Sequence, residues 1–331
     1  MIQDHLGRPL SALRVSVIDQ CNLRCTYCMP ADVFNKNYPY LRPEDILSFD
    51  EILFVIQSAM RLGVNKIRLT GGEPLLRPNL NQLIHKIKAL GIEEVALTTN
   101  GLLLDEQADA LYYAGLDRVT VSLDALHPNL FQKISGRSIS IQKVLDGLQA
   151  AKNVGFKNMK INAVIQRGVN ESEIYPLAQY ARTEGFQLRF IEFMDVGHTN
   201  DWSNDQVVTG REILQLLQTY WPITPVIPPQ NHVAREWVYD DGLGKIGFIN
   251  SVSEAFCGGC DRGRLTADGI FYTCLFSAKG LDLKPCLRRS MSIPTLTDLL
   301  ASQWGQRQDR YSEIRAIANE QPRIEMSRMG G

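Results

Sequence analysis

Three cysteines lie close together near the start of the chain, at Cys21, Cys25 and Cys28, in the spacing C-x3-C-x2-C. The group supplies three thiolates and no fourth ligand, whereas a closed tetrahedral zinc site needs four ligands. An iron–sulfur cubane held by three cysteines instead keeps one iron free to bind another molecule. An apolar alternating segment at residues 13–17 precedes the group, so the cysteines are expected on a loop after a strand. Three buried thiols or part of a zinc knuckle are the alternatives, although no His or Cys follows at zinc-finger spacing.

The composition of the chain describes a globular protein of 331 residues, with 44% hydrophobic and 21% charged residues. This length suits one α/β barrel with an extension, or two ordinary domains. The net charge of −1 gives no global basic field, which argues against nucleic acid as a partner. No apolar run is long enough to span a membrane, and residues 1–8 lack the apolar core of a signal peptide, so we expect a cytoplasmic protein without membrane contact. Seven cysteines in such a chain are expected to be metal ligands rather than disulfides.

Apolar alternating segments and helical patterns take turns from residue 13 to about residue 194. Glycines follow most of the helical patterns, where they favour a left-handed helix end. Such repeated units predict parallel strands joined by right-handed crossovers. The expected strands are Leu13–Ile18, Lys66–Thr70, Glu94–Thr99, Arg118–Leu123, Met159–Ile165 and Leu188–Met194. The expected helices lie near 43–62, 79–90, 105–114, 127–134, 141–155 and 173–184.

The two faces of these strands differ in polarity. One face is apolar and suits the covering helices, whereas the other carries Arg14, Arg68 and Lys160 among Ser, Thr and Asn side chains. A closed eight-stranded barrel fills its interior with branched apolar residues, and buried unpaired charges are costly. We therefore expect an α/β fold with a partial, TIM-like barrel of six βα units whose interior holds an anionic substrate. Internal ion pairs with Asp124 and Glu192 as counter-ions are the alternative.

Several polar or glycine-containing segments directly follow these strands, at the strand ends where barrel enzymes build their sites. Gly71-Gly72-Glu73-Pro74 follows the second strand, where glycines would let the backbone approach a ligand and Glu73 would accept a hydrogen bond from an amine. Together with the C-x3-C-x2-C loop, this segment resembles the radical S-adenosylmethionine (SAM) superfamily.

This resemblance implies that the three cysteines hold a 4Fe-4S cluster whose open iron chelates SAM. The SAM contacts that it implies are Tyr27, Gly72, Glu73, Ser122, Asn162, Arg189 and Met194. Ordinary strand polarity explains Ser122 equally well without the resemblance, and core packing is the alternative for Met194.

The last third of the chain changes character, and we expect a barrel domain over residues 1–200 and a C-terminal α+β domain over residues 201–331. Hairpin signals precede and follow a second cysteine group, Cys257, Cys260 and Cys274, in the spacing C-x2-C-x13-C. This group again offers three thiolates. Structural zinc is the alternative, with Cys286 as the fourth ligand; otherwise Cys286 is expected to be a small buried residue.

With this second group, the chain resembles the GTP 3′,8-cyclase family of molybdenum cofactor biosynthesis over essentially its whole length. The matching segments are Asp4–Arg8, the first cysteine loop, Gly71–Pro74, Thr98–Gly101, Ser122–Asp124, the second cysteine group and Gly330-Gly331. The resemblance implies a second 4Fe-4S cluster that faces guanine. It also implies that a 5′-deoxyadenosyl radical removes hydrogen from C3′ of GTP, and that the C3′ radical attacks guanine C8. The product is the cyclised triphosphate, (8S)-3′,8-cyclo-7,8-dihydroguanosine 5′-triphosphate.

A triphosphate requires a set of Arg and Lys side chains around it. The expected GTP contacts are Arg14, Arg68, Thr98, Lys160, Arg262, Gly263, Arg264, Gly330 and Gly331. Arg262 and Arg264 are one residue apart, so on a strand both side chains face the same side, and with the first three cysteines they form the expected catalytic set. The alternatives are a solvated hairpin face for the two arginines, ordinary strand polarity for Thr98 and a disordered Gly-Gly end.

The resemblance also implies partners. The product would pass to the cyclic pyranopterin monophosphate synthase, and a flavodoxin or ferredoxin would donate the electron. A monomer and a homodimer both stay open. Two other functions stay open as well: another radical SAM enzyme with an auxiliary cluster, such as a peptide-modifying enzyme, and a non-catalytic metal-binding protein that recognises nucleic acid. The net charge and the absence of an aromatic–basic stripe count against the latter.

Overall fold

A single mixed sheet of 12 strands organises the computed structural model, which describes residues 2–227, 234–289, 291–315 and 323–330. Its strand order is β12-β11-β10-β1-β2-β3-β4-β5-β6-β9-β8-β7. The six central strands run parallel to one another and follow the order of the chain. They are β1 Ala12–Ser16, β2 Lys66–Thr70, β3 Glu94–Thr99, β4 Arg118–Ser122, β5 Lys160–Ile165 and β6 Gln187–Glu192.

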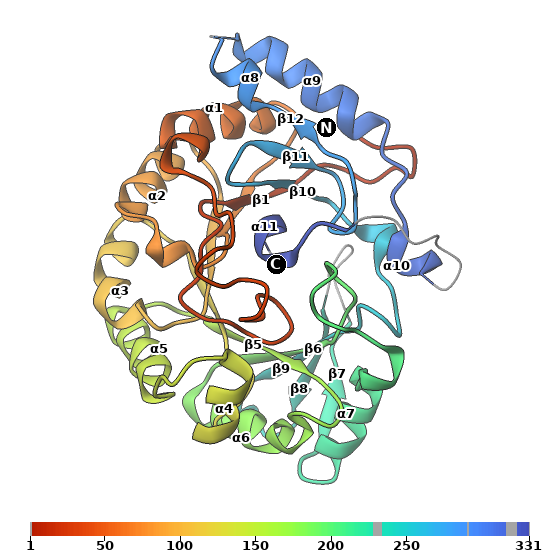
Figure 1. Ribbon diagram of the computed structural model, residues 1–331. Helices are drawn as coiled ribbons and strands as arrows, with labels where there is room; N and C mark the ends of the chain where they lie inside the picture. Colours follow the sequence, from red (N-terminus) through yellow and green to blue (C-terminus); the bar gives the residue numbers. More distant parts are fainter. Residues whose placement is uncertain (1, 228–233, 290, 316–322, 331) are drawn as a thin grey trace.

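Helices connect the central strands. They are α1 Phe49–Met60, α2 Leu80–Ala89, α3 Leu104–Tyr113, α4 Pro128–Ser135, α5 Gln142–Val154 and α6 Ile174–Glu184, with 3-10 turns η1 Pro43–Asp45, η2 Pro74–Leu76 and η3 Glu171–Glu173. Figure 1 shows the sheet curved, with these α-helices on its outer side. The expected parallel α/β arrangement is therefore confirmed. The single helix predicted over 43–62 is wrong, because Ser48 and Glu51 form a capping box that starts α1 at Phe49.

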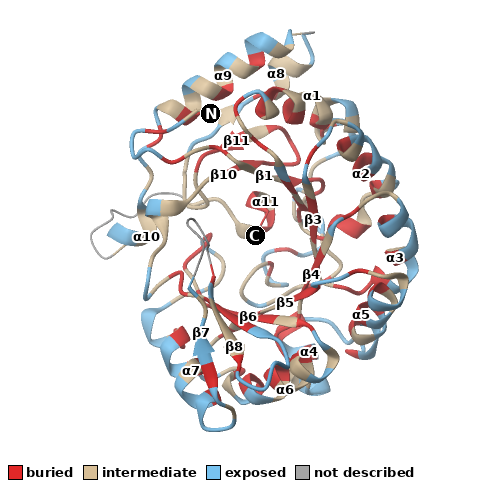
Figure 2. Ribbon diagram, turned by 180° about the vertical axis from the view of Figure 1, so that it is seen from behind, coloured by how far each residue is buried: buried red, intermediate tan, exposed pale blue. Residues whose placement is uncertain are grey.

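The outward-facing side chains of the central strands form the hydrophobic core with the helices. Val15 on β1, Leu97 on β3 and Val121 on β4 are completely buried in this core. Figure 2 shows buried residues along the strands and on the sides of the helices that face them. The apolar side chains of the central strands therefore face the helices. The alternating polar side chains lie on the inner face of the sheet, opposite the helices.

The C-terminal third adds strands to both edges of the central sheet. On one side β10 Arg262–Leu265 pairs in parallel with β1, and β11 Ile270–Tyr272 and β12 Leu281–Asp282 follow. On the other side β9 Lys245–Ile249 pairs in parallel with β6, and β8 Arg235–Tyr239 and β7 Ile223–Pro225 follow. The division at residue 200 stays a prediction, but the sheet is continuous across it.

The remaining helices are short, apart from α7 and α9. They are α7 Gly210–Gln218, α8 Lys284–Leu287, α9 Ile293–Gly305, α10 Tyr311–Ile314 and α11 Met326–Met329, with 3-10 turns η4 Asn204–Gln206 and η5 Cys257–Gly259. Both ribbon views place α11 near the middle of the ring of strands, on the inner face (Figures 1 and 2). In the described part of the chain, no helix is both long enough and apolar enough to cross a membrane.

Candidate active site

The first cysteine loop follows β1 and is folded tightly by Arg24. The guanidinium donates to the carbonyl oxygens of Phe34 (2.6 Å), Cys21 (2.7 Å) and Leu23 (2.7 Å). The backbone of the loop also bonds to the end of α4, where a Cβ on Gly136 would collide with the Arg24 carbonyl. These contacts fix the backbone from which the three thiols project.

The three thiols of this loop lie within electrostatic reach of one another. Burial raises the pKa of Cys21 to about 11 and that of Cys28 to about 12, and it also raises the pKa of Cys25 well above its ordinary value. The thiols are therefore protonated without a metal, and a metal cluster would displace their protons. Among the described residues, no three metal-ligating side chains converge on the position of a single ion. Thiolates that each bind a different iron of a cubane need not converge on one point, so this donor set fits a cluster better than one zinc ion.

The Gly-Gly-Glu loop after β2 packs directly against the backbone that leads into the cysteines. The N–H of Gly72 donates to the carbonyl of Ile18 (2.8 Å), and a Cβ on Gly72 would collide with the carbonyl oxygen of Gln20. We expected a glycine at position 72 because a ligand would approach its backbone closely. In the structure, the backbone of Gln20 is the close neighbour that leaves no room for a side chain. Glu73 accepts from Thr99 Oγ1 (2.7 Å) and from the Leu75 and Asn100 N–H groups, and burial raises its pKa to about 7.

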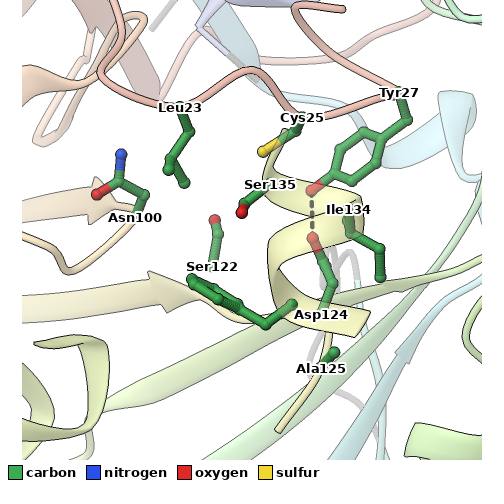
Figure 3. Close-up of a pocket in the computed structure, with 10 residues that line it drawn as sticks. Leu23, Cys25, Tyr27, Asn100, Ser122, Asp124, Ala125, Ile134 and Ser135 are labelled. Atoms are coloured by element: carbon green, nitrogen blue, oxygen red, sulfur yellow. Dashed lines mark hydrogen bonds between the residues drawn. The ribbon is translucent and has the colours of Figure 1, made fainter. Parts of the chain in front are cut away.

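A pocket lies between the first cysteine loop, the ends of β3 and β4, and α4. Figure 3 shows Cys25, Tyr27, Asn100, Ser122 and Asp124 around it. The Tyr27 hydroxyl donates to Asp124 Oδ2 (2.7 Å), while the Val164 N–H donates to Asp124 Oδ1 (2.8 Å). Tyr27 and Ser122, both predicted SAM contacts, thus meet beside Cys25, and Asp124 fixes the ring of Tyr27.

Three predicted SAM contacts occupy directly paired positions on neighbouring strands: Ser122 on β4, Asn162 on β5 and Arg189 on β6. Asn162 Oδ1 and Arg189 Nε are buried and have no hydrogen-bond partner in the described chain. Buried polar atoms of this kind need a partner, so this row can accept a polar ligand. Met194 lies beyond the end of β6, which stops at Glu192 rather than at the predicted Met194.

A second row of paired positions crosses five strands of the inner face and carries four arginines. The row runs Arg264, Arg14, Arg68, Ala96, Arg118 from β10 to β4. Burial, followed by repulsion from neighbouring arginines, lowers the pKa of Arg14 and of Arg68. Arg118 forms an ion pair with Glu94, whereas the close packing of Arg264, Arg14 and Arg68 suits an anionic ligand that carries several charges.

Two further predicted GTP contacts lie beside this row. Arg68 donates to Thr98 Oγ1 at 3.0 Å, and Lys160 is 8% exposed with its pKa lowered to about 7 by burial, then by Arg189 and Arg118. The alternative with internal counter-ions is wrong for its two acids. Asp124 is engaged as described above, and Glu192 accepts from the N–H groups of Gly210, Val252 and Ser253.

The second cysteine group lies at η5 and beyond β11, next to the inner face. Arg262 Nη2 donates to Cys260 Sγ at 3.5 Å. Burial by itself raises the pKa of the Cys260 thiol, but Arg262 and Arg307 outweigh it and lower that pKa to about 6. Burial and then Asp309 raise the pKa of Cys274 to about 11. The two arginines thus favour the thiolate form of Cys260.

Residues from both ends of the chain support this second group. Asp4 forms buried ion pairs with Arg8 (2.6 Å) and Arg307 (3.3 Å). Arg8 donates to the Cys257 carbonyl (2.9 Å), and Arg307 donates to the Cys260 carbonyl (2.6 Å). The segment Asp4–Arg8, which entered the sequence analysis only as part of a resemblance, therefore holds the backbone of the second cysteine loop.

The Gly-Gly end of the chain reaches the arginine row. Arg264 Nη1 donates to the carbonyl oxygens of Met329 (2.9 Å) and Gly330 (2.8 Å), and Arg14 Nη1 donates to Gly330 at 3.3 Å. Gly331 lies outside the described residues. Gly263 faces Leu10 and Phe271, on the side opposite its neighbours' guanidiniums.

Sequence reasoning missed several residues that shape this site. Asn100 donates to Asn22 Oδ1 (2.7 Å) and reaches Cys21 Sγ at 3.8 Å, and its place directly after β3 was the available signal. Arg118 lies on the inner face, where it forms an ion pair with Glu94. The available signal was its position two residues before Thr120, because alternate residues of a strand face the same side. No local pattern pointed to Arg307, whose role depends on contacts with the N-terminus.

Comparisons with known proteins agree with this geometry. The family described as "Radical SAM superfamily" matches residues 15–181, and the one described as "Molybdenum Cofactor Synthesis C" matches residues 186–313. The chain is 48% identical over 333 residues to the GTP 3′,8-cyclase of Xanthomonas campestris pv. campestris strain 8004, covering 100% of this chain and 97% of the relative. It is 43% identical over 338 residues to the GTP 3′,8-cyclase of Staphylococcus epidermidis, covering 100% and 99%.

A solved structure shares the fold. SuiB of Streptococcus suis, crystallised with S-adenosylmethionine, superimposes with a TM-score of 0.63 at 16% identity, covering 95% of this chain and 69% of SuiB. The match in identity and coverage to the curated relatives, together with the two cysteine groups and the arginine row, leads to one conclusion. The chain belongs to the GTP 3′,8-cyclase family of radical SAM proteins.

Proposed function

We propose that this protein cyclises GTP to (8S)-3′,8-cyclo-7,8-dihydroguanosine 5′-triphosphate, the first step of molybdenum cofactor biosynthesis. The observation that carries the proposal is the row Arg264–Arg14–Arg68 on the inner face, with the buried Lys160 nearby, in a chain that also has two groups of three cysteines. A nucleoside triphosphate brings about four negative charges, which these cations can neutralise. Its guanine and ribose would then lie toward the cysteines.

The first cysteine loop is proposed to hold the 4Fe-4S cluster and SAM. When bound, they supply the one-electron chemistry that removes the hydrogen from C3′ of the ribose. Cys21, Cys25 and Cys28 would ligate the cluster. Tyr27, Ser122 and the unsatisfied Asn162 and Arg189 would orient SAM, with the other predicted contacts Gly72, Glu73 and Met194 around it. Asp124 would keep Tyr27 in place, and Glu73 would fix the end of β3.

The substrate residues would act by charge and by orientation. Arg14, Arg68, Lys160 and Arg264 would bind the phosphates, while Thr98 orients Arg68. Arg262 would lie between the phosphates and the second cysteine group, because its guanidinium already contacts Cys260. Burial of these cations excludes water and strengthens their interaction with an anion.

A second 4Fe-4S cluster is proposed at Cys257, Cys260 and Cys274. Arg262 and Arg307, which lower the pKa of Cys260, favour a thiolate there. The protein purified without air should then carry about eight iron atoms per chain, and Cys274→Ala should reduce this number to about four. About four iron atoms in the wild type, with zinc in the second site, would contradict the second cluster.

Product analysis tests the function as a whole. The reconstituted protein is incubated without oxygen with GTP, SAM and a reductant, and the nucleotide product is identified by mass spectrometry. We expect a product of the same mass as GTP with the cyclised skeleton, and 5′-deoxyadenosine in equal amount. SAM cleavage that does not depend on GTP would instead favour a different radical SAM substrate, such as a peptide. We further propose that a flavodoxin or ferredoxin reduces the protein and that the product passes to the cyclic pyranopterin monophosphate synthase.

A further inference from the structure

The last described segment, residues 325–330, is anchored at its start by the loop after β6. The Glu325 carboxylate accepts hydrogen bonds from the His198 N–H (3.0 Å) and from the Thr199 hydroxyl (2.9 Å). Gly197 directly precedes these donors with a φ of +78°, and a Cβ there would collide with the same carboxylate. The loop is therefore shaped to receive Glu325, and any larger residue at Gly197 would push it away.

The same segment is anchored near its end by an ion pair between Arg328 and Asp268. Asp268 is buried in the turn between β10 and β11, and its other oxygen accepts from the Thr266 hydroxyl at 2.6 Å, which fixes the carboxylate. Ser16 on β1 adds a hydrogen bond to the Arg328 carbonyl at 3.2 Å. The segment thus bridges the β10–β11 hairpin, whose first strand carries Arg264, and β1, which carries Arg14.

Directly after the second anchor, the backbone of the segment contacts the arginine row. One nitrogen of Arg264 donates to the carbonyl oxygens of both Met329 and Gly330. A guanidinium has five N–H donors, and the tail occupies two of those of Arg264. The same Gly330 oxygen accepts from Arg14, so one carbonyl dipole lies between two cations that repel each other.

We propose that Asp268 and Glu325 are positioning residues of this active site. They hold residues 325–330 so that the carbonyl oxygens of Met329 and Gly330 orient Arg264 and Arg14 toward the triphosphate. Arg328 is the partner through which Asp268 acts. The inference rests on the proposed function for the identity of the ligand, but the anchoring itself is a property of the chain without substrate.

Hydrogen–deuterium exchange of the full-length holoenzyme tests the anchoring. Asp268→Asn and Glu325→Gln each remove a charge-assisted interaction, so the amides of residues 326–330 should exchange about tenfold faster in either variant. The amides of β3 and β4 should exchange as in the wild type. Asp268→Glu keeps the carboxylate and should restore slow exchange. Asp241→Asn, which removes the carboxylate of a surface ion pair with Arg182, is the matched control and should change nothing.

Ligand binding tests the consequence for the arginines. In both variants the Kd for GTP should rise about tenfold, whereas the Kd for SAM should stay at its wild-type value. Unchanged exchange in both variants, or an equal change in Asp241→Asn, would overturn the anchoring. Faster exchange with an unchanged Kd for GTP would overturn the link between the tail and the arginines. A wild type that does not bind GTP would refute the proposed function and leave the exchange result standing.

Discussion

At the scale of single residues, the inner-face arginines were predictable and their neighbours were not. Alternation along a strand assigns Arg14 and Arg68 to one face because side chains alternate with a period of two. The bond between Tyr27 and Asp124 joins residues 97 positions apart, and nothing local distinguishes Asp124 from any other carboxylate at a strand end. The sequence thus predicted which arginines lie together on the inner face. The hydrogen-bond partner of each side chain could be identified only in the folded structure.

Lys160 leads to a prediction about pH. Burial, then Arg189 and Arg118, lowers its pKa from 10.5 to about 7, so at pH 8 most of it is neutral before a ligand binds. A triphosphate favours the charged form and raises this pKa, so binding between about pH 7 and 10 should take up about one proton. Calorimetry at pH 8 in two buffers of different ionisation enthalpy measures the uptake.

Lys160→Met serves as the comparison, because it removes the titrating group. Its proton uptake should be lower than in the wild type by about one proton at pH 8. Below about pH 6 the wild type already carries the charge, so the difference should disappear there. Equal uptake in the two proteins at pH 8 would refute the assignment.

At the scale of elements, the central strands and helices were predicted closely because each combines a periodic pattern with an end signal. β2 and β3 were predicted at their observed bounds, Lys66–Thr70 and Glu94–Thr99. The break before α1 was missed because the capping box of Ser48 and Glu51 lies within a segment that also continues the helical pattern. The SAM contact of Gly72 stays a prediction, and the crowding that requires a glycine there comes from a chain segment more than 50 residues earlier.

Gly72→Ala tests how the Gly-Gly loop supports the cysteines. Because a Cβ would overlap the Gln20 carbonyl, one of the two backbones must move, which should cost about 1–3 kcal/mol of unfolding free energy. The displaced segment leads into Cys21, so iron bound at the first site should also fall. Gly305→Ala meets nothing within 4 Å and is the matched control. Urea unfolding and iron analysis measure both effects, and equal behaviour of the two variants would contradict the crowding argument.

At the scale of the whole molecule, the sheet joins segments that no sequence pattern connects. β10 was expected as a hairpin strand, and the hairpin is present, but its pairing with β1 depends on shape and burial rather than on local propensity. The same holds for the buried network of Asp4, Arg8 and Arg307. The conformation of the second cysteine loop therefore depends on residues from distant parts of the sequence.

Asp4→Asn tests this dependence. The change removes the buried acid that Arg8 and Arg307 share, and leaves Arg307 only its longer ion pair with Asp309 at 3.8 Å. Because the side chains of Arg8 and Arg307 are 2% and 1% exposed, breaking a buried pair in this way costs about 3–5 kcal/mol. Chemical denaturation without oxygen should show this loss. Asp50→Asn removes an exposed partner of Lys86 and should change stability by less than about 0.5 kcal/mol. A loss in Asp4→Asn as small as in Asp50→Asn would show that the network is dispensable.

The hydrogen bond between Ser11 and Asp261 joins residues 250 positions apart, at the start of the β1–β10 pairing. During synthesis on a ribosome, β1 emerges early, while β10, with which it pairs, is still untranslated. Contacts of such long range form slowly, because the loop between them must close first. A nascent chain therefore exposes one edge of β1 until residues 262–265 have left the exit tunnel.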